Sequence, residues 1–466
     1  MVLWLEWWKW ATRLRGACSR ERTFYWMLVV LVGFAVREDM LGVSSFIRCL
    51  GLLPCCYDRI LDFFHGNALN PAELARIWTA SALTFHPGVF RVRGLPVLVG
   101  DGLKNPKEGR KMPGVKLLHQ ESESNTKPEY IMGHSCQAIC LLVWGLAGVM
   151  ALPLTAAIHE GVVFSNRDRR TLLDKMAAMA FGLGIESGFI FLADSYYASR
   201  KMILPLLLRG CHLVSRLRSN AVAYMFALPP VPGKRGRPKL YGEKIRLITL
   251  FDQPEKMTDA ESPVYGEQGV RIRYRTTDLL WRPIGIAVRF VAVIHPIRGR
   301  CILMSTDLTM TALEIIGLYG LRFKIEVSFK QALHTVGAYL YHFWMIAMTP
   351  LKRHDGDQYL HRKSDEYRNA VRRKLAAYQR FLQVGVVAQG IMVALATTAP
   401  ALVWNSFGSW LRTANTAKSP SEMVVAMALR NQLPEFLMGG GAAAKLVKFI
   451  RERMDFSRES CRRKAA

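Results

Sequence analysis

Two short apolar runs in this sequence each stop at an aspartate. Residues 95–100 precede Asp101, and residues 188–193 precede Asp194. Runs of this length, bounded by turn-forming residues, are typical of buried strands. A strand end in a mixed sheet holds a carboxylate rigidly and leaves it open to water. Either aspartate alone is an ordinary feature, because a strand-terminal Asp is often a turn former or a helix N-cap.

The pattern around these strands predicts an α/β protein with helical regions at both ends. Helical periodicity dominates residues 1–90, strands and helices alternate over 91–208, and polar/apolar alternation marks 209–305 as a β-rich insertion. Helical patterning returns over 306–350 and continues through 351–466. A chain of 466 residues is long enough for two to four domains and at least one large core.

Residues 44–61 fit a helix, a turn and a second helix. That arrangement suits a DNA-reading element, and a plain helical packing region fits it equally well.

Two apolar segments are long enough to cross a bilayer, residues 138–158 and 384–404. The first carries Gly145 and Gly148 at its middle, which predicts buried hairpin strands joined by a glycine-rich turn. The second is rich in small residues and suits a buried helix. We therefore expect neither segment to lie in a membrane.

The charge of the chain points to a polyanionic partner. Lys and Arg number 63 against 36 Asp and Glu, and the formal net charge is +27. A surface this basic attracts nucleic acid or an anionic membrane face. The nine cysteines form no paired CxxC motif, so neither a disulfide framework nor a zinc site is supported. Cys136 and Cys140 lie in an apolar run and are expected to be small core residues.

A third acid stands out because of its neighbours. Arg322, Glu326 and Lys330 are spaced by four and share one helix face, and Tyr319 lies one turn earlier. A charged stripe of this kind usually faces solvent. Here the surrounding helix is apolar, so the stripe can face a cleft instead. The start of the helical stretch, from Thr311 to Glu314, has the spacing of a capping box.

Residues 319–330 read YGLRFKIEVSFK. This segment resembles the Y-x2-R-x3-E signature of bacterial insertion-sequence DDE transposases of the cut-and-paste type, in which the glutamate is the third catalytic acid. In that family the first two acids each end a strand, as Asp101 and Asp194 do here, and a β-rich insertion precedes the glutamate. The resemblance covers residues 91–345 and implies a ribonuclease-H-like catalytic core, divided into 91–208 and 306–350 by the insertion.

The resemblance implies that Asp101, Asp194 and Glu326 are catalytic and bind metal. Carboxylates without cysteine favour a hard ion such as Mg²⁺, for which Mn²⁺ can substitute. Two such ions clamp the attacking and leaving oxygens of a phosphodiester. The expected partners are transposon-end inverted-repeat DNA and target DNA. A homodimer is expected when two ends are synapsed, with a cytoplasmic, nucleoid-associated location and no membrane partner.

One position departs from the family signature. The family has a Lys seven positions after the glutamate, and here residue 333 is Leu. Lys330, on the same face as Glu326, or His334 is the candidate replacement. Tyr319, Arg322 and Lys330 are expected to contact DNA.

Two further features are candidate DNA contacts. Arg235, Arg237 and Lys239 belong to a segment resembling the Arg-Gly-Arg-Pro core of AT hooks, which enter the minor groove; the favoured alternative is a flexible basic loop that touches phosphates. Trp281, in the insertion, is a candidate for stacking on a flipped base, and core packing is its other predicted role.

Two other classes of protein compete with a transposase. A non-catalytic, sequence-specific DNA-binding protein, such as an inactivated relative, would share the charge and the N-terminal helices of residues 1–90. A polytopic membrane protein would share the apolar segments. We favour the transposase because a DNA-binding protein has no need of acids that end two strands and a helix.

Overall fold

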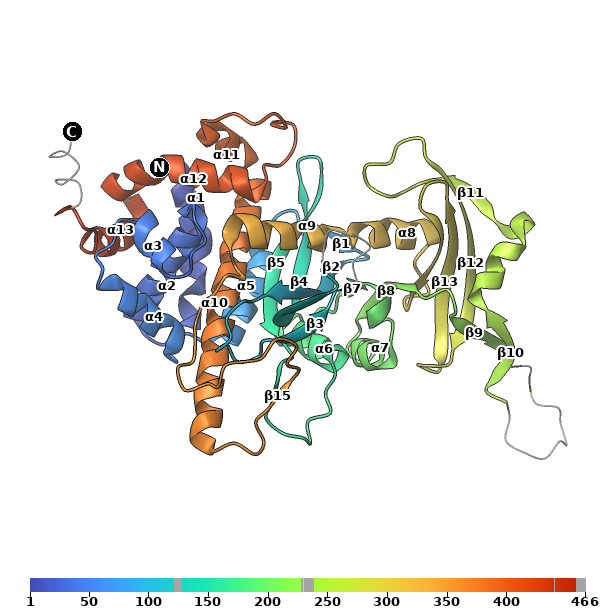
Figure 1. The fold of residues 1–466 in the computed structure, drawn as a ribbon. Helices are drawn as coiled ribbons and strands as arrows, with labels where there is room; N and C mark the ends of the chain where they lie inside the picture. Colours follow the sequence, from blue (N-terminus) through green and yellow to red (C-terminus); the bar gives the residue numbers. More distant parts are fainter. Residues whose placement is uncertain (121–127, 228, 230–238, 440, 458–466) are drawn as a thin grey trace.

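The computed structural model describes residues 1–120, 128–227, 229, 239–439 and 441–457. Its centre is a mixed sheet in which the strands lie in the order β5-β4-β2-β7-β8 (Figure 1). These strands are β2 (Leu95–Pro106), β4 (Tyr130–Gly145), β5 (Gly148–Ile158), β7 (Ile190–Ala193) and β8 (His212–Leu217). β2, β7 and β8 run parallel to one another, whereas β4 is antiparallel to both β2 and β5.

Short elements complete the first half of this core. They are β1 (Arg91–Val92), β3 (Lys116–His119), β6 (Val162–Val163), α6 (Leu172–Gly182), the 3-10 turn η2 (Ser195–Tyr197) and α7 (Arg200–Leu207). The apolar runs that end at Asp101 and Asp194 do form strands, as the sequence predicts. β2 is longer than the apolar run that precedes Asp101, because it continues beyond Asp101 to Pro106.

The apolar segment at 138–158 is the β4–β5 hairpin predicted from its glycines. β4 is buried from Gly133 to Val143, and the turn at its tip joins Gly145 to Gly148. Cys136 and Cys140 are each 1% exposed, which confirms them as core residues. The segment is apolar because both of its faces are covered by protein.

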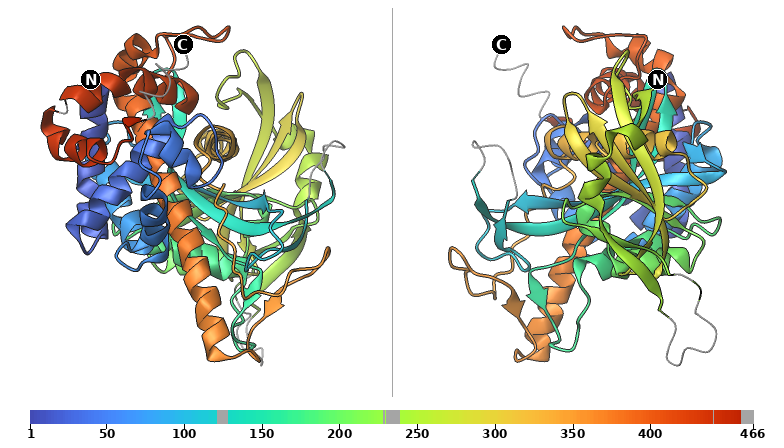
Figure 2. Two further views of the ribbon diagram at one scale, coloured as in Figure 1. Left: turned by 60° about the vertical axis from the view of Figure 1, so that its left-hand side comes forward. Right: turned by 90° about the vertical axis from the view of Figure 1, so that its right-hand side faces the viewer.

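Helices from the two ends of the chain form one layer against this hairpin (Figure 2). The N-terminal helices are α1 (Val2–Ala11), η1 (Thr12–Ala17), α2 (Glu21–Val36), α3 (Ser44–Cys49), α4 (Cys56–His65) and α5 (Pro71–Phe85). The C-terminal helices are α10 (Asp365–Thr398), α11 (Pro400–Phe407), α12 (Glu422–Gly439), η6 (Gly441–Ala443) and α13 (Ala444–Arg451). The helix-turn-helix predicted over 44–61 is present as α3 and α4.

α10 is the axis of this helical layer. It is long and apolar enough to cross a membrane, but 89% of its apolar window is buried inside the protein. Its N-terminal turns are largely exposed, and its side chains from Ala377 to Ala396 pack against α2, α5 and β5. Burial by protein accounts for its composition. The expected helical character of 351–364 is wrong, because this stretch contains only the short strand β15 (Gln358–Tyr359) before α10 begins.

The insertion is built from strands that extend the central sheet. Its elements are β9 (Val222–Phe226), β10 (Tyr241–Arg246), η3 (Leu247–Asp252), η4 (Pro254–Lys256), β11 (Thr258–Glu261), β12 (Arg271–Trp281), β13 (Ile286–His295) and β14 (Gly299–Ser305). β14 pairs with β8, so a single sheet runs from the insertion into the core. β8 itself, which the sequence grouped with the insertion, lies in the central sheet next to β7.

The chain returns to the core through two short helices, α8 (Ala312–Leu321) and α9 (Lys324–Gln331). The predicted capping box is present: Thr311 accepts from the backbone N–H of Glu314, whose carboxylate accepts from the N–H of Thr311. The helical stretch is shorter than the patterning over 306–350 predicts. A π turn, η5 (Ala332–Val336), ends at Gly337, which has a φ of +70° that glycine adopts readily.

The end of this helical stretch is anchored by the N-terminal region. The buried guanidinium of Arg37 donates to the carbonyl oxygens of Val336 (2.6 Å) and Gly337 (3.0 Å). The helices therefore satisfy carbonyl groups that the end of η5 leaves without helical partners. Taken together, the mixed sheet, the β-rich insertion and the flanking helices match the predicted ribonuclease-H-like α/β architecture.

Candidate active site

Asp101 and Asp194 are brought together by the register of two parallel strands. The last paired residues of β2 and β7 are Val99 and Leu192, and each aspartate lies two positions beyond this pair. Parallel strands present their carboxyl ends at the same side of a sheet, where ligands commonly bind. The Asp194 carboxylate also accepts a hydrogen bond from the backbone N–H of Tyr196 (3.1 Å), which fixes it as the cap of η2.

Glu326 comes to the same place from α9. Ile325 and Phe329 are buried against the core, and this burial turns Glu326 toward the strand ends. Arg322, in the break between α8 and α9, connects the acids. Its Nη1 donates to Asp101 Oδ2 (3.0 Å) and its Nη2 donates to Glu326 Oε1 (2.5 Å).

These residues line one open cleft of about 760 Å³. The lining is predominantly polar and comes from β2, β7, β8, α8 and α9: Asp101, Asp194, Ser195, Arg216, Leu217, Arg218, Ser219, Asn220, Tyr319, Arg322 and Glu326. The structure thus brings together five residues that the sequence predicted for the site, namely the three acids, Tyr319 and Arg322.

Two arginines in the cleft were missed by the sequence reasoning. Arg216 and Arg218 follow the last paired residues of β8 with β7 and are exposed. Neither forms an ion pair with any residue in the described part of the chain. Their alternation with apolar residues was visible, but it was interpreted as an insertion strand with one wet face.

The electrostatics of the cleft centre on Asp101. Burial raises the pKa of its carboxyl to about 6, and the nearby negative charge of Asp194 adds to the rise. The guanidinium of Arg322 opposes this by favouring the ionised form. When the pKa of a carboxyl in a cleft is raised, a cation bound beside it stabilises the ionised form of that carboxyl.

A buried hydrogen-bond chain lies behind Asp101. Gln137, opposite Gly102 on β4, donates to the hydroxyl of Tyr197 (2.9 Å), and His159 Nδ1 lies 2.5 Å from the other end of the Gln137 amide. Burial raises the pKa of Tyr197, and the charge of Asp101 adds to that rise. These hydrogen bonds connect β4 to the turn that follows Asp194, so they support the positions of both aspartates.

The donor chemistry of the cleft fits a hard divalent cation, because all three acids offer oxygen ligands. Within the described ranges, no three His, Cys, Asp or Glu side chains already lie together as a metal-binding group. Arg322 donates instead to one carboxylate oxygen of Asp101 and to one of Glu326. An ion held by Asp101 and Asp194 would relieve the repulsion that raises the pKa of Asp101.

The other residues predicted for the site either lie away from this cleft or fall outside the residues that the structure describes. Lys330 is exposed one turn beyond Glu326, His334 is exposed in η5, and Leu333 packs against the core. Trp281 is 6% exposed at the end of β12, a placement that fits core packing. Lys239 is exposed, and Arg235 and Arg237 lie outside the described residues.

Gly100, beside the first acid, allows a close approach by the neighbouring strand. A Cβ at this position would lie 2.2 Å from Cζ of the buried Phe191. We predict that Gly100→Ala lowers the free energy of unfolding by about 1–3 kcal/mol, because the ring has no room to shift. Urea unfolding measures the effect.

Gly182→Ala is the matched control for this prediction. Gly182 lies at the end of α6, and a Cβ there meets nothing within 4 Å. Its substitution is expected to stay within about 0.5 kcal/mol of the original protein. Equal stabilities of the two variants would contradict the close packing of Phe191 on Gly100.

Comparison with known protein families gives a match that includes two of the three acids. The family model described as "DDE superfamily endonuclease" matches residues 17–282, more than half of the chain. This chain belongs to the DDE superfamily of endonucleases. The matched region contains Asp101 and Asp194 and ends before Glu326. A search of curated proteins found no match.

Membership of the DDE superfamily establishes the broad character of the protein. It is transposase-like, of the nuclease class, and enzymes of this superfamily use divalent metal ions. The superfamily also agrees with the ribonuclease-H-like fold. The match begins at residue 17 and therefore includes most of the N-terminal helices as well as the first part of the core.

Proposed function

We propose that this DDE-superfamily protein is a DNA transposase of the Y-x2-R-x3-E group. It cleaves the ends of its own element and joins the freed 3′-hydroxyls to target DNA. The observation that carries the proposal is that Asp101, Asp194 and Glu326, from two strands and a helix, line one cleft together with Arg322. A protein that only binds DNA has no need of this arrangement.

Asp101, Asp194 and Glu326 are the residues that would hold Mg²⁺ or Mn²⁺. When bound, two such ions stabilise the attacking and leaving oxygens of the phosphodiester. The remaining polar groups of the cleft suit the DNA strand itself. Arg216 and Arg218 are exposed cations that form no ion pair with any described residue, and one guanidinium group can donate two parallel hydrogen bonds to the oxygens of a phosphate.

Arg322 has a second role in this proposal. In the protein alone, the Arg322 guanidinium pairs with both Asp101 and Glu326. Its positive charge offsets part of the repulsion among the carboxylates in the cleft. A phosphate group that enters the cleft can take over the same guanidinium, which frees oxygen atoms on both acids. Tyr319, half-buried in the wall of the cleft one turn before Arg322, is placed to contact the same strand.

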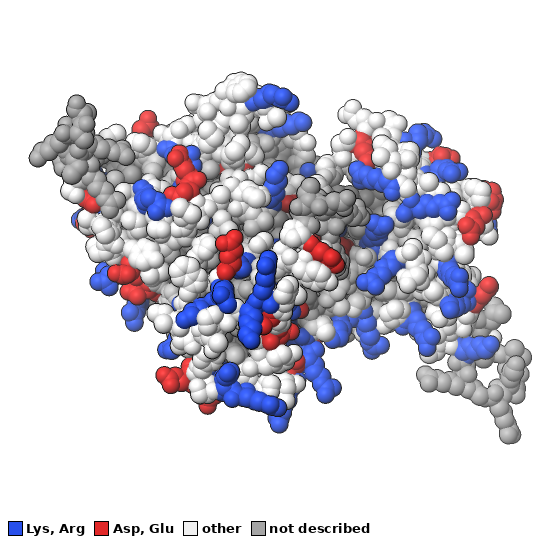
Figure 3. Space-filling view, in the orientation of Figure 1, with Lys and Arg blue, Asp and Glu red and all other residues white. Residues whose placement is uncertain are grey.

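The broader setting follows from the same proposal. The partners are transposon-end inverted repeats and target DNA, and two chains pair when two ends are synapsed. Residues 1–90 bind DNA, 91–208 and 306–350 form the catalytic core, and 209–305 and 351–466 are the insertion and the C-terminal helices. Lys and Arg side chains spread over the insertion and the core suit a nucleoid-associated, cytoplasmic protein (Figure 3).

The direct test uses the DNA that flanks the gene on both sides. Linear duplexes carrying these flanks are incubated with the full-length protein in Mg²⁺, in Mn²⁺ or in EDTA. We expect breaks at two inverted repeats, with 3′-hydroxyl ends, in either metal and none in EDTA. Binding of the same duplexes without any break in either metal would contradict the proposal and favour a non-catalytic DNA-binding protein.

A further inference from the structure

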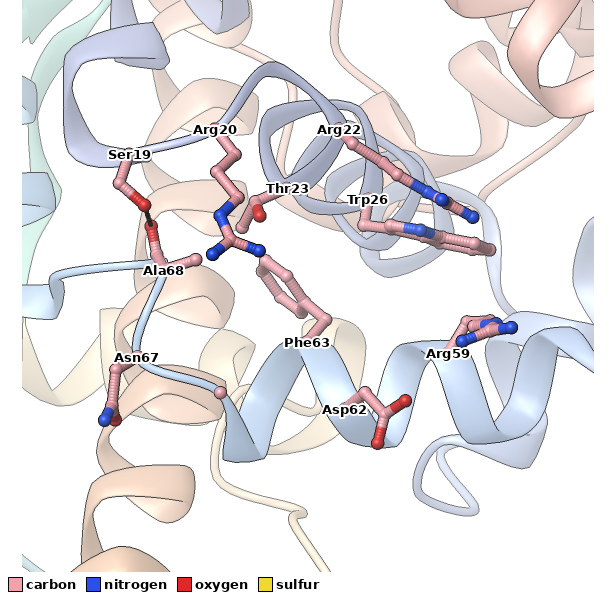
Figure 4. Close-up of a pocket in the computed structure, with 11 residues that line it drawn as sticks. Ser19, Arg20, Arg22, Thr23, Trp26, Arg59, Asp62, Phe63, Asn67 and Ala68 are labelled. Carbon is pink, nitrogen blue, oxygen red and sulfur yellow. Dashed lines mark hydrogen bonds between the residues drawn. The ribbon is translucent and has the colours of Figure 1, made fainter.

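A second open cleft, of about 570 Å³, lies among the N-terminal helices, away from the three acids. One wall is the start of α2, the other is α4, and the loop after α4 closes one end (Figure 4). Its lining residues are Ser19, Arg20, Arg22, Thr23, Trp26, Arg59, Asp62, Phe63, Gly66, Asn67 and Ala68. Arg20 and Arg22 reach in from one wall, and Arg59 projects from the other (Figure 4).

The cleft is strongly basic. The side chains of Arg20, Arg22 and Arg59 are all exposed, and none of these guanidinium groups forms an ion pair or a hydrogen bond with another described residue. Asp62 is the one acid in its lining, so the lining carries more positive than negative charge. Three guanidinium groups that pair with no residue in the described part of the chain, on two facing walls, form a site for an extended anion rather than a set of surface ion pairs.

The loop that closes the cleft is held in place by hydrogen bonds from α10. The buried guanidinium of Arg380, on α10, donates to the carbonyl oxygens of Phe64 and Leu69 (both 3.1 Å) and to Asn67 Oδ1 (3.0 Å). The backbone N–H of Ser19 donates to the carbonyl oxygen of Ala68 (2.9 Å), which joins the loop to the α2 wall. The walls are thus fixed before any ligand arrives, and rigid walls lower the entropic cost of binding.

We propose that this cleft binds the sugar–phosphate backbone of duplex DNA. The inference rests on the proposed function, because it takes DNA as the polyanion that the chain meets. Charge complementarity supports this occupant: arginines on two walls of an open cleft fit a continuous line of phosphates better than a single small anion. Trp26 and Phe63 are only 6% exposed, so neither offers a face on which a base could stack. The contacts therefore position DNA without reading its sequence.

Arg20→Gln/Arg59→Gln in the full-length protein tests the proposal. Each phosphate contact contributes roughly 0.9 to the slope of log K against log salt. Binding of a 30-base-pair duplex of arbitrary sequence, followed by fluorescence anisotropy from low to high salt, should show a slope smaller by about two. At 0.1 M salt the affinity should fall roughly tenfold or more, equally for different sequences.

Two comparisons make the result specific. Arg169→Gln/Arg412→Gln removes the same charge from exposed arginines that form no ion pair with a described residue and lie outside this cleft, so its slope should be unchanged. Arg20→Lys/Arg59→Lys keeps the charge and should restore most of the slope. Melting curves should coincide for all variants, since every substituted side chain is exposed.

The outcomes separate this inference from the proposed function. An unchanged slope in Arg20→Gln/Arg59→Gln, with the original protein still cleaving its ends, overturns the cleft assignment alone. Failure of the original protein to bind any duplex overturns both proposals. If inorganic phosphate stabilises the original protein but not the double variant, and DNA affinity is the same in both, the cleft is a small-phosphate site and the DNA assignment is wrong.

Discussion

Asp194→Asn is expected to lower metal-dependent cleavage of the element's ends by roughly 10³-fold, equivalent to about 4 kcal/mol in the activation barrier. The substitution removes a charge from the pair of strand-end acids while keeping the shape of the side chain. The Asn oxygen can still cap η2 by accepting from the N–H of Tyr196, so the fold should not change. Cleavage is measured on the end duplexes with Mg²⁺ and with Mn²⁺.

End binding supplies the internal check on this result. Asp194→Asn should bind the same duplexes at least as tightly as the original protein, since it removes negative charge from a cleft that receives phosphates. Asp252→Asn is the matched control, because Asp252 is exposed at the end of η3 and forms no ion pair within the described ranges. If the Asp194→Asn variant still cleaved the end duplexes in Mg²⁺ at the rate of the original protein, Asp194 would not belong to the proposed site.

Asp101→Asn is expected to stabilise the protein at neutral pH while abolishing cleavage. The pKa of the Asp101 carboxyl rises from 3.8 to about 6 on folding, chiefly because of burial. The folded protein therefore holds this proton more tightly than the unfolded chain does. Stability falls as the pH rises from about 4 to about 6, and the loss is complete above that range. Asn carries no charge, so the variant should gain roughly 2–3 kcal/mol at pH 7.5.

The sign of the effect is checked by repeating the measurement in acid. Unfolding in urea with EDTA present should show the gain at pH 7.5 and little difference below about pH 3, where the Asp101 carboxyl is largely protonated in both the folded and the unfolded state. A variant that is less stable than the original protein at pH 7.5 would mean that Arg322 outweighs burial at Asp101. The expected result would mean that Asp101 is needed for activity although its charge lowers the stability of the folded protein.

Much of the site could be predicted from local patterns. The strands that lead to Asp101 and Asp194 are short, apolar and bounded by turns, and the capping box at Thr311 and Glu314 marks the helical return. The apolar face made by Ile325 and Phe329 leaves Glu326 on an adjacent face of α9. Each of these signals lies within a few residues of the side chain it places.

Other parts depend on contacts that no local pattern contains. β2 continues past Asp101 because β4 pairs with it as far as Pro106, although the sequence there is polar. The helix after Tyr319 breaks at Arg322 and ends at Gly337, where Arg37 from the far end of the chain binds its last carbonyls. Arg216 joins the cleft only because β8 runs parallel to β7, and this pairing links two strands separated by α7.

The continuity of the sheet through β8 has a consequence for the insertion. β8 has β7 on one side and β14 on the other, and the β14 pairing covers residues from Val214 to Leu217. Without β14, the edge of β8 that faces away from β7 would be left unpaired, and exposed sheet edges recruit other chains and promote aggregation. The insertion therefore protects the rim of the core from self-association. A shortened chain without the insertion would expose an unpaired, aggregation-prone edge of β8, the strand that carries Arg216 into the cleft.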